Sequence, residues 1–149
     1  MSPEGLVIIG PLGLEALTAT GWRVDAVGGL TLGADPIAYA ISYASMLAGS
    51  PLRAFTVRKE VKTHGTGRLV EGPFKEGDRV AIVEDVITTG GSALRAATAV
   101  RAAGGHVAGV LALVDREEGG SAALEAAGLQ VCAIVRAEEI LVRMTRVIA

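Results

Sequence analysis

Two adjacent carboxylates, Glu84 and Asp85, follow a short apolar run and precede a turn that is rich in hydroxyl groups and glycine. The turn, residues 88–92, reads Thr-Thr-Gly-Gly-Ser and leads into a predicted helix over residues 93–103. Glycine lets the backbone approach a ligand closely, and the N–H groups at a helix N-terminus favour an anion. Carboxylate oxygens accept hydrogen bonds from sugar hydroxyls. These residue types in this order predict a site for a ribose phosphate.

The same stretch does not fit two common phosphate-binding motifs. A P-loop would read Gly-x4-Gly-Lys-Ser/Thr, and residues 84–92 contain no lysine. The dinucleotide fingerprint Gly-x-Gly-x-x-Gly is also absent there. A simpler alternative is a buried strand with an acidic end, followed by a capped helix. That alternative leaves unexplained why the acidic pair and the Thr-Thr-Gly-Gly-Ser turn occur together.

A second segment, residues 58–68, is locally basic. Its charged side chains are Arg58, Lys59, Lys62, His64 and Arg68, opposed only by Glu60. Because the whole chain carries a net charge of −2, any attraction for phosphate must be local. The chain has no long basic run and no alternation of aromatic and basic residues, so general nucleic-acid binding is not expected. Taken alone, the segment could be a solvated charged loop.

Apolar segments that could form strands alternate with segments that could form helices. The predicted strands are 24–28, 52–57, 79–83, 107–114 and 129–135, and the predicted helices are 4–20, 35–48, 93–103, 121–127 and 137–147, the last helical or mixed. This alternation is typical of a doubly wound, mostly parallel α/β sheet. Residues 58–73 show neither period and are predicted to be a loop.

The predicted strand ends bring the chemically interesting segments to one edge. In such sheets ligands bind at the carboxyl ends of the strands. The glycine-rich loop 29–33, the basic loop 58–68, residues 84–92 and the pair Asp115-Arg116 all follow predicted strands. We therefore expect one site rather than several.

Length and composition limit the class of protein. Half of the 149 residues are apolar but only 3% are aromatic, and no run approaches the roughly 18–20 apolar residues of a membrane span. Cys132 is the only cysteine, so no disulfide can form within the chain. The first residues, Met-Ser-Pro-Glu-Gly, do not look like a signal peptide. We expect a single domain over residues 1–149, in the cytoplasm, without a membrane or nucleic-acid partner.

Four segments resemble those of a known enzyme family. Residues 80–92, Val-Ala-Ile-Val-Glu-Asp-Val-Ile-Thr-Thr-Gly-Gly-Ser, resemble the signature of type I phosphoribosyltransferases, which bind 5-phosphoribosyl 1-diphosphate (PRPP). Residues 58–65 resemble the Arg-Lys-x-x-Lys-x-His-Gly loop of orotate phosphoribosyltransferases. Residues 24–33 are similar to that family's pyrophosphate-binding strand and loop. Residues 114–120 resemble its Asp-Arg-x-x-Gly-Gly segment, whose arginine contacts the orotate carboxylate.

The resemblance implies a reaction and its partners. Phosphoribosyl would pass from PRPP to orotate, giving orotidine 5′-monophosphate and pyrophosphate in pyrimidine (UMP) biosynthesis. Mg²⁺ would be held by pyrophosphate and ribose oxygens rather than by protein ligands. The protein would be a homodimer in which loop 58–68 completes the neighbour's site. The alternatives are a purine phosphoribosyltransferase and a non-catalytic regulator that senses PRPP.

The resemblance also implies the roles of individual residues. The expected catalytic residues are Lys59, Lys62 and His64. The expected PRPP-binding residues are Arg58, Lys59, Lys62, His64, Glu84, Asp85, Val86, Ile87, Thr88, Thr89, Gly90, Gly91 and Ser92. Thr88 and Arg116 are expected to contact orotate, and no residue is expected to bind a metal directly.

The chain departs from the family pattern in two places. The family has an N-terminal segment before the first helix, with a substrate-contacting lysine, and this chain starts too late to hold it. The expected fold is therefore that of the family with this segment missing. Many bacterial members also carry a lysine in the pyrophosphate loop, where this chain has Thr31-Leu32-Gly33. Both departures remove positive charge, and we expect them to lower turnover.

Overall fold

A six-stranded sheet forms the centre of the structure, a computed structural model that describes residues 2–60 and 68–148. The strand order is β3-β2-β1-β4-β5-β6, and all neighbours are parallel except β2 and β3. The bounds are β1 (Ala26–Leu30), β2 (Arg53–Val57), β3 (Val70–Glu71), β4 (Arg79–Ile87), β5 (His106–Asp115) and β6 (Val131–Arg136). The predicted mostly parallel α/β architecture is thus confirmed.

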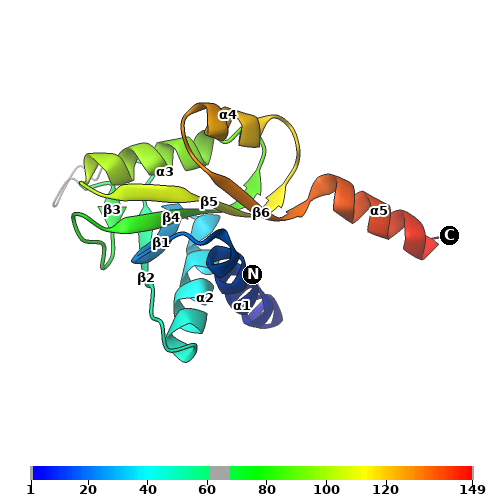
Figure 1. Cartoon of the computed structure of the whole chain (residues 1–149), viewed down its shortest axis with the longest axis horizontal. Helices are drawn as coiled ribbons and strands as arrows, with labels where there is room; N and C mark the ends of the chain where they lie inside the picture. The colour runs from blue at the N-terminus through cyan, green and yellow to red at the C-terminus, as the bar shows by residue number, and fades with distance from the viewer. Residues whose placement is uncertain (1, 61–67, 149) are drawn as a thin grey trace.

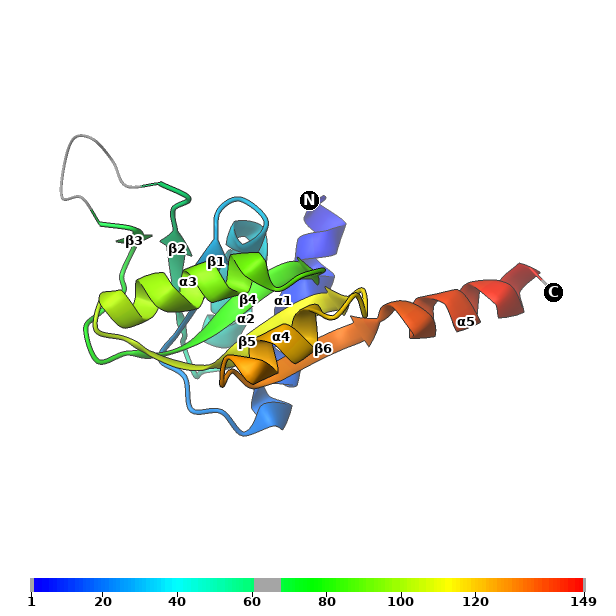
Figure 2. The ribbon, with the colours of Figure 1, turned by 90° about the horizontal axis from the view of Figure 1, so that it is seen from above.

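Helices cover both faces of this sheet. Their bounds are α1 (Pro3–Thr20), α2 (Ala34–Leu47), α3 (Gly91–Ala102), α4 (Gly120–Ala126) and α5 (Ala137–Ile148). Helices α1 and α2 lie on one face, and α3 and α4 lie on the other (Figure 1). Helix α5 extends away from the body of the molecule, as the view turned by 90° also shows (Figure 2).

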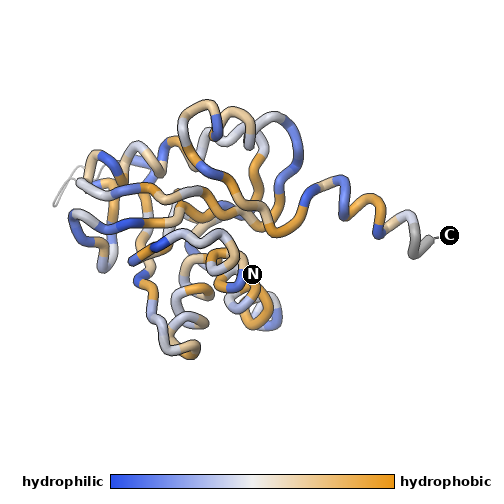
Figure 3. Tube along the Cα trace, viewed as in Figure 1, coloured by the Kyte–Doolittle hydropathy of each residue, from blue (hydrophilic) through white to orange (hydrophobic). Residues whose placement is uncertain are grey.

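Alternate residues of the central strands supply two hydrophobic cores. On β4, Val80 and Ile82 belong to the core beneath α3 and α4, whereas Ala81 and Val83 belong to the core beneath α1 and α2. A strand that is covered on both faces must be apolar at nearly every position. This explains why the strands read as continuous apolar runs in the sequence, and Figure 3 shows these runs along the middle of the molecule.

The chain leaves the centre of the sheet in two directions. From β1 it moves outward to β2 and β3, and it then returns to β4 on the other side of β1 and continues to β5 and β6. Strands β1 and β4 are therefore neighbours at the point where the order reverses. In open α/β sheets a ligand crevice forms at such a switch point, outside the carboxyl ends of the strands.

Several boundaries differ from the sequence-based expectation. Strand β1 runs Ala26–Leu30 rather than over 24–28, so the loop that follows it begins at Thr31 rather than at Gly29. Strand β4 continues to Ile87 because Val86 and Ile87 pair with Val114 and Asp115 of β5, so the acidic pair lies inside the strand rather than at its end. Helix α3 begins at Gly91, two residues earlier than predicted. The segment 58–73 is not irregular throughout, since Val70–Glu71 pairs with β2 in an antiparallel ladder.

Across residues 2–60 and 68–148, no helix combines the length and the apolar character that crossing a bilayer requires.

Candidate functional site

The acidic pair on β4 presents its two carboxylates in different surroundings. Successive residues of a strand point to opposite faces, so Glu84 and Asp85 diverge. Glu84 is 8% exposed, whereas Asp85 is exposed at the carboxyl edge. Asp85 Oδ1 accepts a hydrogen bond from the backbone N–H of Val86 at 2.8 Å. A Cβ atom on Gly33 would lie 2.8 Å from Asp85 Oδ2, so this carboxylate faces the loop that follows β1.

Glu84 is buried without a compensating hydrogen bond from the described part of the chain. Burial, and to a smaller degree the negative charge of Asp85, raises the pKa of Glu84 from 4.5 to about 7. A carboxylate in this state has unused acceptor capacity and faces an energetic cost of ionisation. A ligand that brings hydroxyl donors to Glu84 would supply the missing hydrogen bonds.

The turn after β4 leaves the N-terminus of α3 open. The residue that precedes the helix, Gly90, has a φ of 78° and provides no side-chain cap. The first N–H groups of a helix lack partners within the helix, so here they remain available to an anion. Thr89, Gly91 and Ser92 are exposed around them. A Cβ atom on Gly90 would lie 2.9 Å from the carbonyl oxygen of Gly120, and this contact fixes the turn against the start of α4.

The segment that carries Arg116 is fastened to the same turn. The backbone N–H of Arg116 donates to the carbonyl oxygen of Ile87 at 3.0 Å. A Cβ atom on Gly120 would lie 2.4 Å from the carbonyl oxygen of Thr88, so a side chain there would push the two segments apart. The guanidinium of Arg116 is about half exposed and pairs with Glu118 at 2.6 Å. Arg116 and the 88–92 turn therefore lie next to each other, as predicted.

The side chain of Asp115 stabilises this segment, a role that the sequence alone did not predict. Asp115 is 7% exposed, and its carboxylate accepts hydrogen bonds from the backbone N–H of Glu117 at 2.8 Å and from Ser121 Oγ at 2.6 Å. Glu117 adopts a φ of 60°. The available signal was an aspartate at a strand end followed by a glycine-rich turn, a pattern in which aspartate often bonds the backbone two residues on.

The loop after β1 approaches the acidic pair from the other side. A Cβ atom on Gly29 would lie 2.2 Å from the carbonyl oxygen of Val83, so only glycine allows β1 to pass this close to β4. The peptide bond between Thr31 and Leu32 is cis. The predicted grouping of this loop with residues 84–92 at one edge is confirmed.

The basic loop is only partly described. Arg58 lies 3.4 Å from Glu71 through its Nη1 atom, and its buried Nε atom has no hydrogen-bond partner in the described residues. Lys59 is exposed, and its carbonyl oxygen accepts a hydrogen bond from Arg95 of α3 at 2.8 Å. This contact ties the start of the loop to the helix that begins at the 88–92 turn. The predicted residues Lys62 and His64 lie outside the described residues.

The raised pKa of Glu84 predicts how stability depends on pH. The folded-state pKa of about 7 exceeds the ordinary 4.5, so the stability contributed by the protonated form is complete below about pH 4.5 and is lost as the pH rises towards 7. Glu84→Gln should therefore match the wild type in acid and exceed its free energy of unfolding by on the order of 3 kcal/mol at about pH 8.

Urea unfolding across this pH range measures the difference. The same change at Glu125, which is exposed on α4, serves as the control and should leave the pH profile of the wild type unaltered. Parallel profiles for Glu84→Gln and the wild type would contradict the assignment of a costly buried carboxylate.

Comparison with known proteins identifies the family. No family model matches the chain. The orotate phosphoribosyltransferase of Aquifex aeolicus is 48% identical over 139 residues, which are 93% of this chain and 75% of the relative. That of Sorangium cellulosum is 54% identical over 136 residues, 90% of this chain and 70% of the relative.

A solved structure gives the same answer. The crystal structure of the Mycobacterium tuberculosis orotate phosphoribosyltransferase in complex with PRPP is similar, with a TM-score of 0.78 and 47% identity. The match covers 89% of this chain and 74% of that chain. The chain belongs to the orotate phosphoribosyltransferase family.

Proposed function

We propose that this chain transfers the phosphoribosyl group of PRPP to orotate, giving orotidine 5′-monophosphate and pyrophosphate in pyrimidine biosynthesis. One observation carries the proposal. The acidic pair of β4, the uncapped N-terminus of α3 and the segment of Arg116 meet at one edge of the sheet. A transfer between a ribose phosphate and a carboxylate-bearing base requires groups for both partners side by side.

PRPP is placed by residues 84–92 in this proposal. The 5′-phosphate lies on the open N-terminus of α3, where the backbone N–H groups of residues 88–92 and the hydroxyls of Thr88, Thr89 and Ser92 donate to it. Glu84 and Asp85 accept hydrogen bonds from the ribose hydroxyls. Val86 and Ile87 link the two parts and set their spacing through their pairing with β5.

The reaction depends on positioning and on charge. Pyrophosphate leaves C1 of the ribose, positive charge develops on the sugar, and the ring nitrogen of orotate attacks. The loop after β1 receives the pyrophosphate beside Asp85. In addition, Arg58, Lys59, Lys62 and His64 neutralise it. His64 is also the candidate for passing a proton, because imidazole titrates near neutral pH.

Mg²⁺ fits this arrangement as a companion of PRPP. Among the described residues no cluster of three His, Cys, Asp or Glu side chains could hold a metal ion. We propose that the oxygens of pyrophosphate and ribose hold Mg²⁺ without a direct protein ligand. The bound ion would neutralise charge on the leaving group.

Orotate is held by Arg116 and Thr88. A planar guanidinium suits a bidentate contact with the orotate carboxylate. In the described structure that guanidinium pairs with Glu118, and both side chains are about half exposed. Exposed ion pairs of this kind contribute little free energy, so the orotate carboxylate can replace Glu118 as the partner of Arg116 at a small cost in binding free energy.

We propose a homodimer in which loop 58–68 of one subunit completes the neighbour's site. An apolar groove of about 1250 Å³ between α1 and α2 supports self-association. Around it Val7 is 74%, Tyr43 69% and Leu47 72% exposed, and clustered apolar exposure of this kind marks protein contacts. We further propose that residues 1–149 act as one domain. We also propose that the protein works in the cytoplasm, because phosphorylated substrates such as PRPP do not diffuse across membranes.

An assay with four bases tests the proposed reaction. With PRPP and Mg²⁺, we expect turnover of orotate and none of adenine, hypoxanthine or xanthine, because Arg116 needs a carboxylate partner. Release of pyrophosphate and formation of the nucleotide measure the rate. Preference for a purine base would assign the chain to another phosphoribosyltransferase class. PRPP binding without turnover of any base would support the alternative function, a non-catalytic regulator that senses PRPP.

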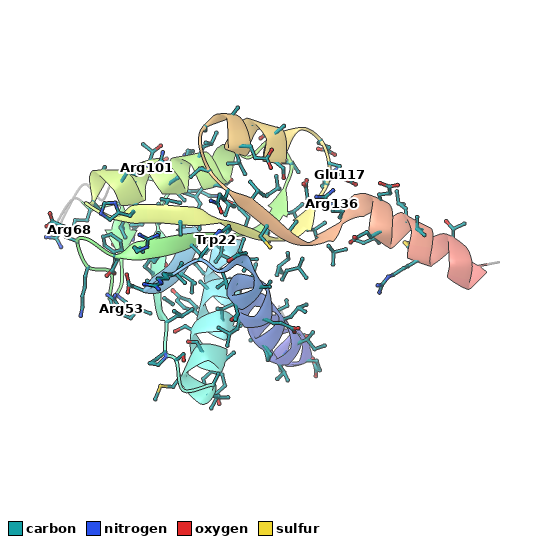
Figure 4. The ribbon with its side chains drawn as sticks, viewed as in Figure 1. Trp22, Arg53, Arg68, Arg101, Glu117 and Arg136 are labelled. Carbon is teal, nitrogen blue, oxygen red and sulfur yellow. The ribbon has the colours of Figure 1, made fainter. Side chains whose placement is uncertain are left out.

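Arg116 should determine the affinity for the base. Arg116→Ala removes a charge-assisted contact, so the KM for orotate should rise roughly 10- to 100-fold while the KM for PRPP changes little. Arg101→Ala is the matched control, because Arg101 lies at the far end of α3 (Figure 4). Steady-state kinetics with each substrate varied measure both constants. Equal changes in the two KM values would show that Arg116 does not contact orotate.

Mixing two inactive variants tests the shared site. One variant carries Lys59→Ala and Lys62→Ala, and the other carries Glu84→Gln and Asp85→Asn. After subunit exchange about one quarter of wild-type activity should return, since half of the dimers are mixed and each holds one intact site. Each variant alone provides the baseline, and mass spectrometry confirms the exchange. No recovery in confirmed mixed dimers would mean that each site is built from one chain.

A further inference from the structure

We infer that Asp35 is a positioning residue that fixes the loop after β1, residues 31–33, for the pyrophosphate of PRPP. The inference rests on the proposed function of that loop. It concerns a residue that contacts no reacting atom and acts by holding the backbone that does.

Hydrogen bonds from two hydroxyls converge on the carboxylate of Asp35. Thr31 Oγ1, in the loop, donates to Asp35 Oδ2 at 2.7 Å. Thr56 Oγ1, on β2, donates to Asp35 Oδ1 at 2.9 Å. Since the single hydroxyl hydrogen of Thr56 is then used, Tyr39 must be the donor in its 3.0 Å contact with Thr56. Asp35 thus connects the loop, the first turn of α2 and β2.

Further contacts leave the loop little freedom. The backbone N–H of Thr31 donates to the carbonyl oxygen of Val57 at 2.8 Å, which attaches the loop to the end of β2. The backbone N–H of Asp35 donates to the carbonyl oxygen of Leu32 at 3.3 Å. On the opposite side Gly33 lies against the carboxylate of Asp85. The loop is held between β2 and the residue proposed to bind the ribose.

The charge of Asp35 fits this role despite the anion expected nearby. Both of its oxygens receive hydroxyl donors, and hydrogen bonds to an ionised acceptor are roughly twice as strong as neutral ones. Its position in the first turn of α2 is also favourable for a negative charge. Residues 31–33 contain no lysine, so the loop offers backbone N–H groups whose direction must be set by such a brace.

Asp78 provides a matched control for a merely structural role. Its carboxylate also accepts two hydrogen bonds, from Arg53 Nη2 at 2.7 Å and from the backbone N–H of Lys75 at 2.8 Å. Arg53 begins β2, so this pair holds the same strand as Asp35 does, but at the opposite end. Figure 4 shows Arg53 on the opposite side of the molecule from Glu117, which follows the carboxyl end of β5.

The test compares Asp35→Ala, Asp35→Asn and Thr31→Val with Asp78→Asn and Tyr39→Phe. The KM values for PRPP, for orotate and, in the reverse reaction, for pyrophosphate are measured for each. Asp35→Ala should raise the KM for PRPP and for pyrophosphate about tenfold and leave that for orotate within about twofold. Asp35→Asn keeps one acceptor oxygen and should fall between. Thr31→Val should follow Asp35→Ala, whereas Asp78→Asn and Tyr39→Phe should resemble the wild type in these constants.

Several results would overturn the inference. They are equal changes in all three KM values, a fall in kcat alone, or the same pattern in Asp78→Asn. If Asp35→Ala does not fold, Thr31→Val decides, since it removes the loop's donor and leaves Asp35 bonded to β2. A wild type that does not convert orotate would defeat the proposed function instead. Calorimetry would then still test the positioning role of Asp35, through the affinities of wild type and Thr31→Val for PRPP and for pyrophosphate. Equal affinities in the two proteins would contradict that role.

Discussion

At the centre of the sheet the backbone of β1 passes so close to its neighbours that no side chain fits between them. A Cβ atom on Gly28 would lie 2.2 Å from the carbonyl oxygen of Phe55, and one on Gly29 would lie 2.2 Å from that of Val83. This close packing of three parallel strands brings the loop after β1 against Asp85. The same constraint recurs where Gly120 meets the turn after β4. Close backbone contacts therefore bring both halves of the site together, and the short side chains of Asp35 and Asp115 then fix their loops.

The carboxylates of the site fall into two kinds according to what satisfies them. Asp35 and Asp115 each accept two hydrogen bonds from within the chain, and both hold a loop in place. Glu84 receives none from the described residues, and Asp85 receives one from its neighbour's backbone. The second kind has capacity left for a ligand, and ribose hydroxyls would supply the donors. Burial raises the pKa of Glu84 to about 7, so an unoccupied site costs stability at neutral pH.

The sequence predicted the alternating fold and the common edge because buried parallel strands and glycine turns leave strong local patterns. It misplaced the end of β4, since two carboxylates favour a strand end, whereas pairing with β5 extends the strand to Ile87. It did not anticipate that Glu84 is buried. The short strand β3 gave no signal within a charged segment. The links from Asp35 to Thr56 join residues far apart in the chain, and only the folded structure brings them together.

The central claim is that residues 84–92 bind PRPP. Isothermal titration of PRPP with Mg²⁺ into the wild type and into a Glu84→Gln, Asp85→Asn double variant tests it most directly. The substitutions keep size and remove charge, and circular dichroism can verify that the variant is folded even though Glu84 is buried. The account predicts that the affinity for PRPP falls tenfold or more, because each amide keeps only one acceptor oxygen and carries no negative charge, so the hydrogen bonds from the ribose hydroxyls are fewer and weaker. An unchanged affinity in a folded double variant would contradict it.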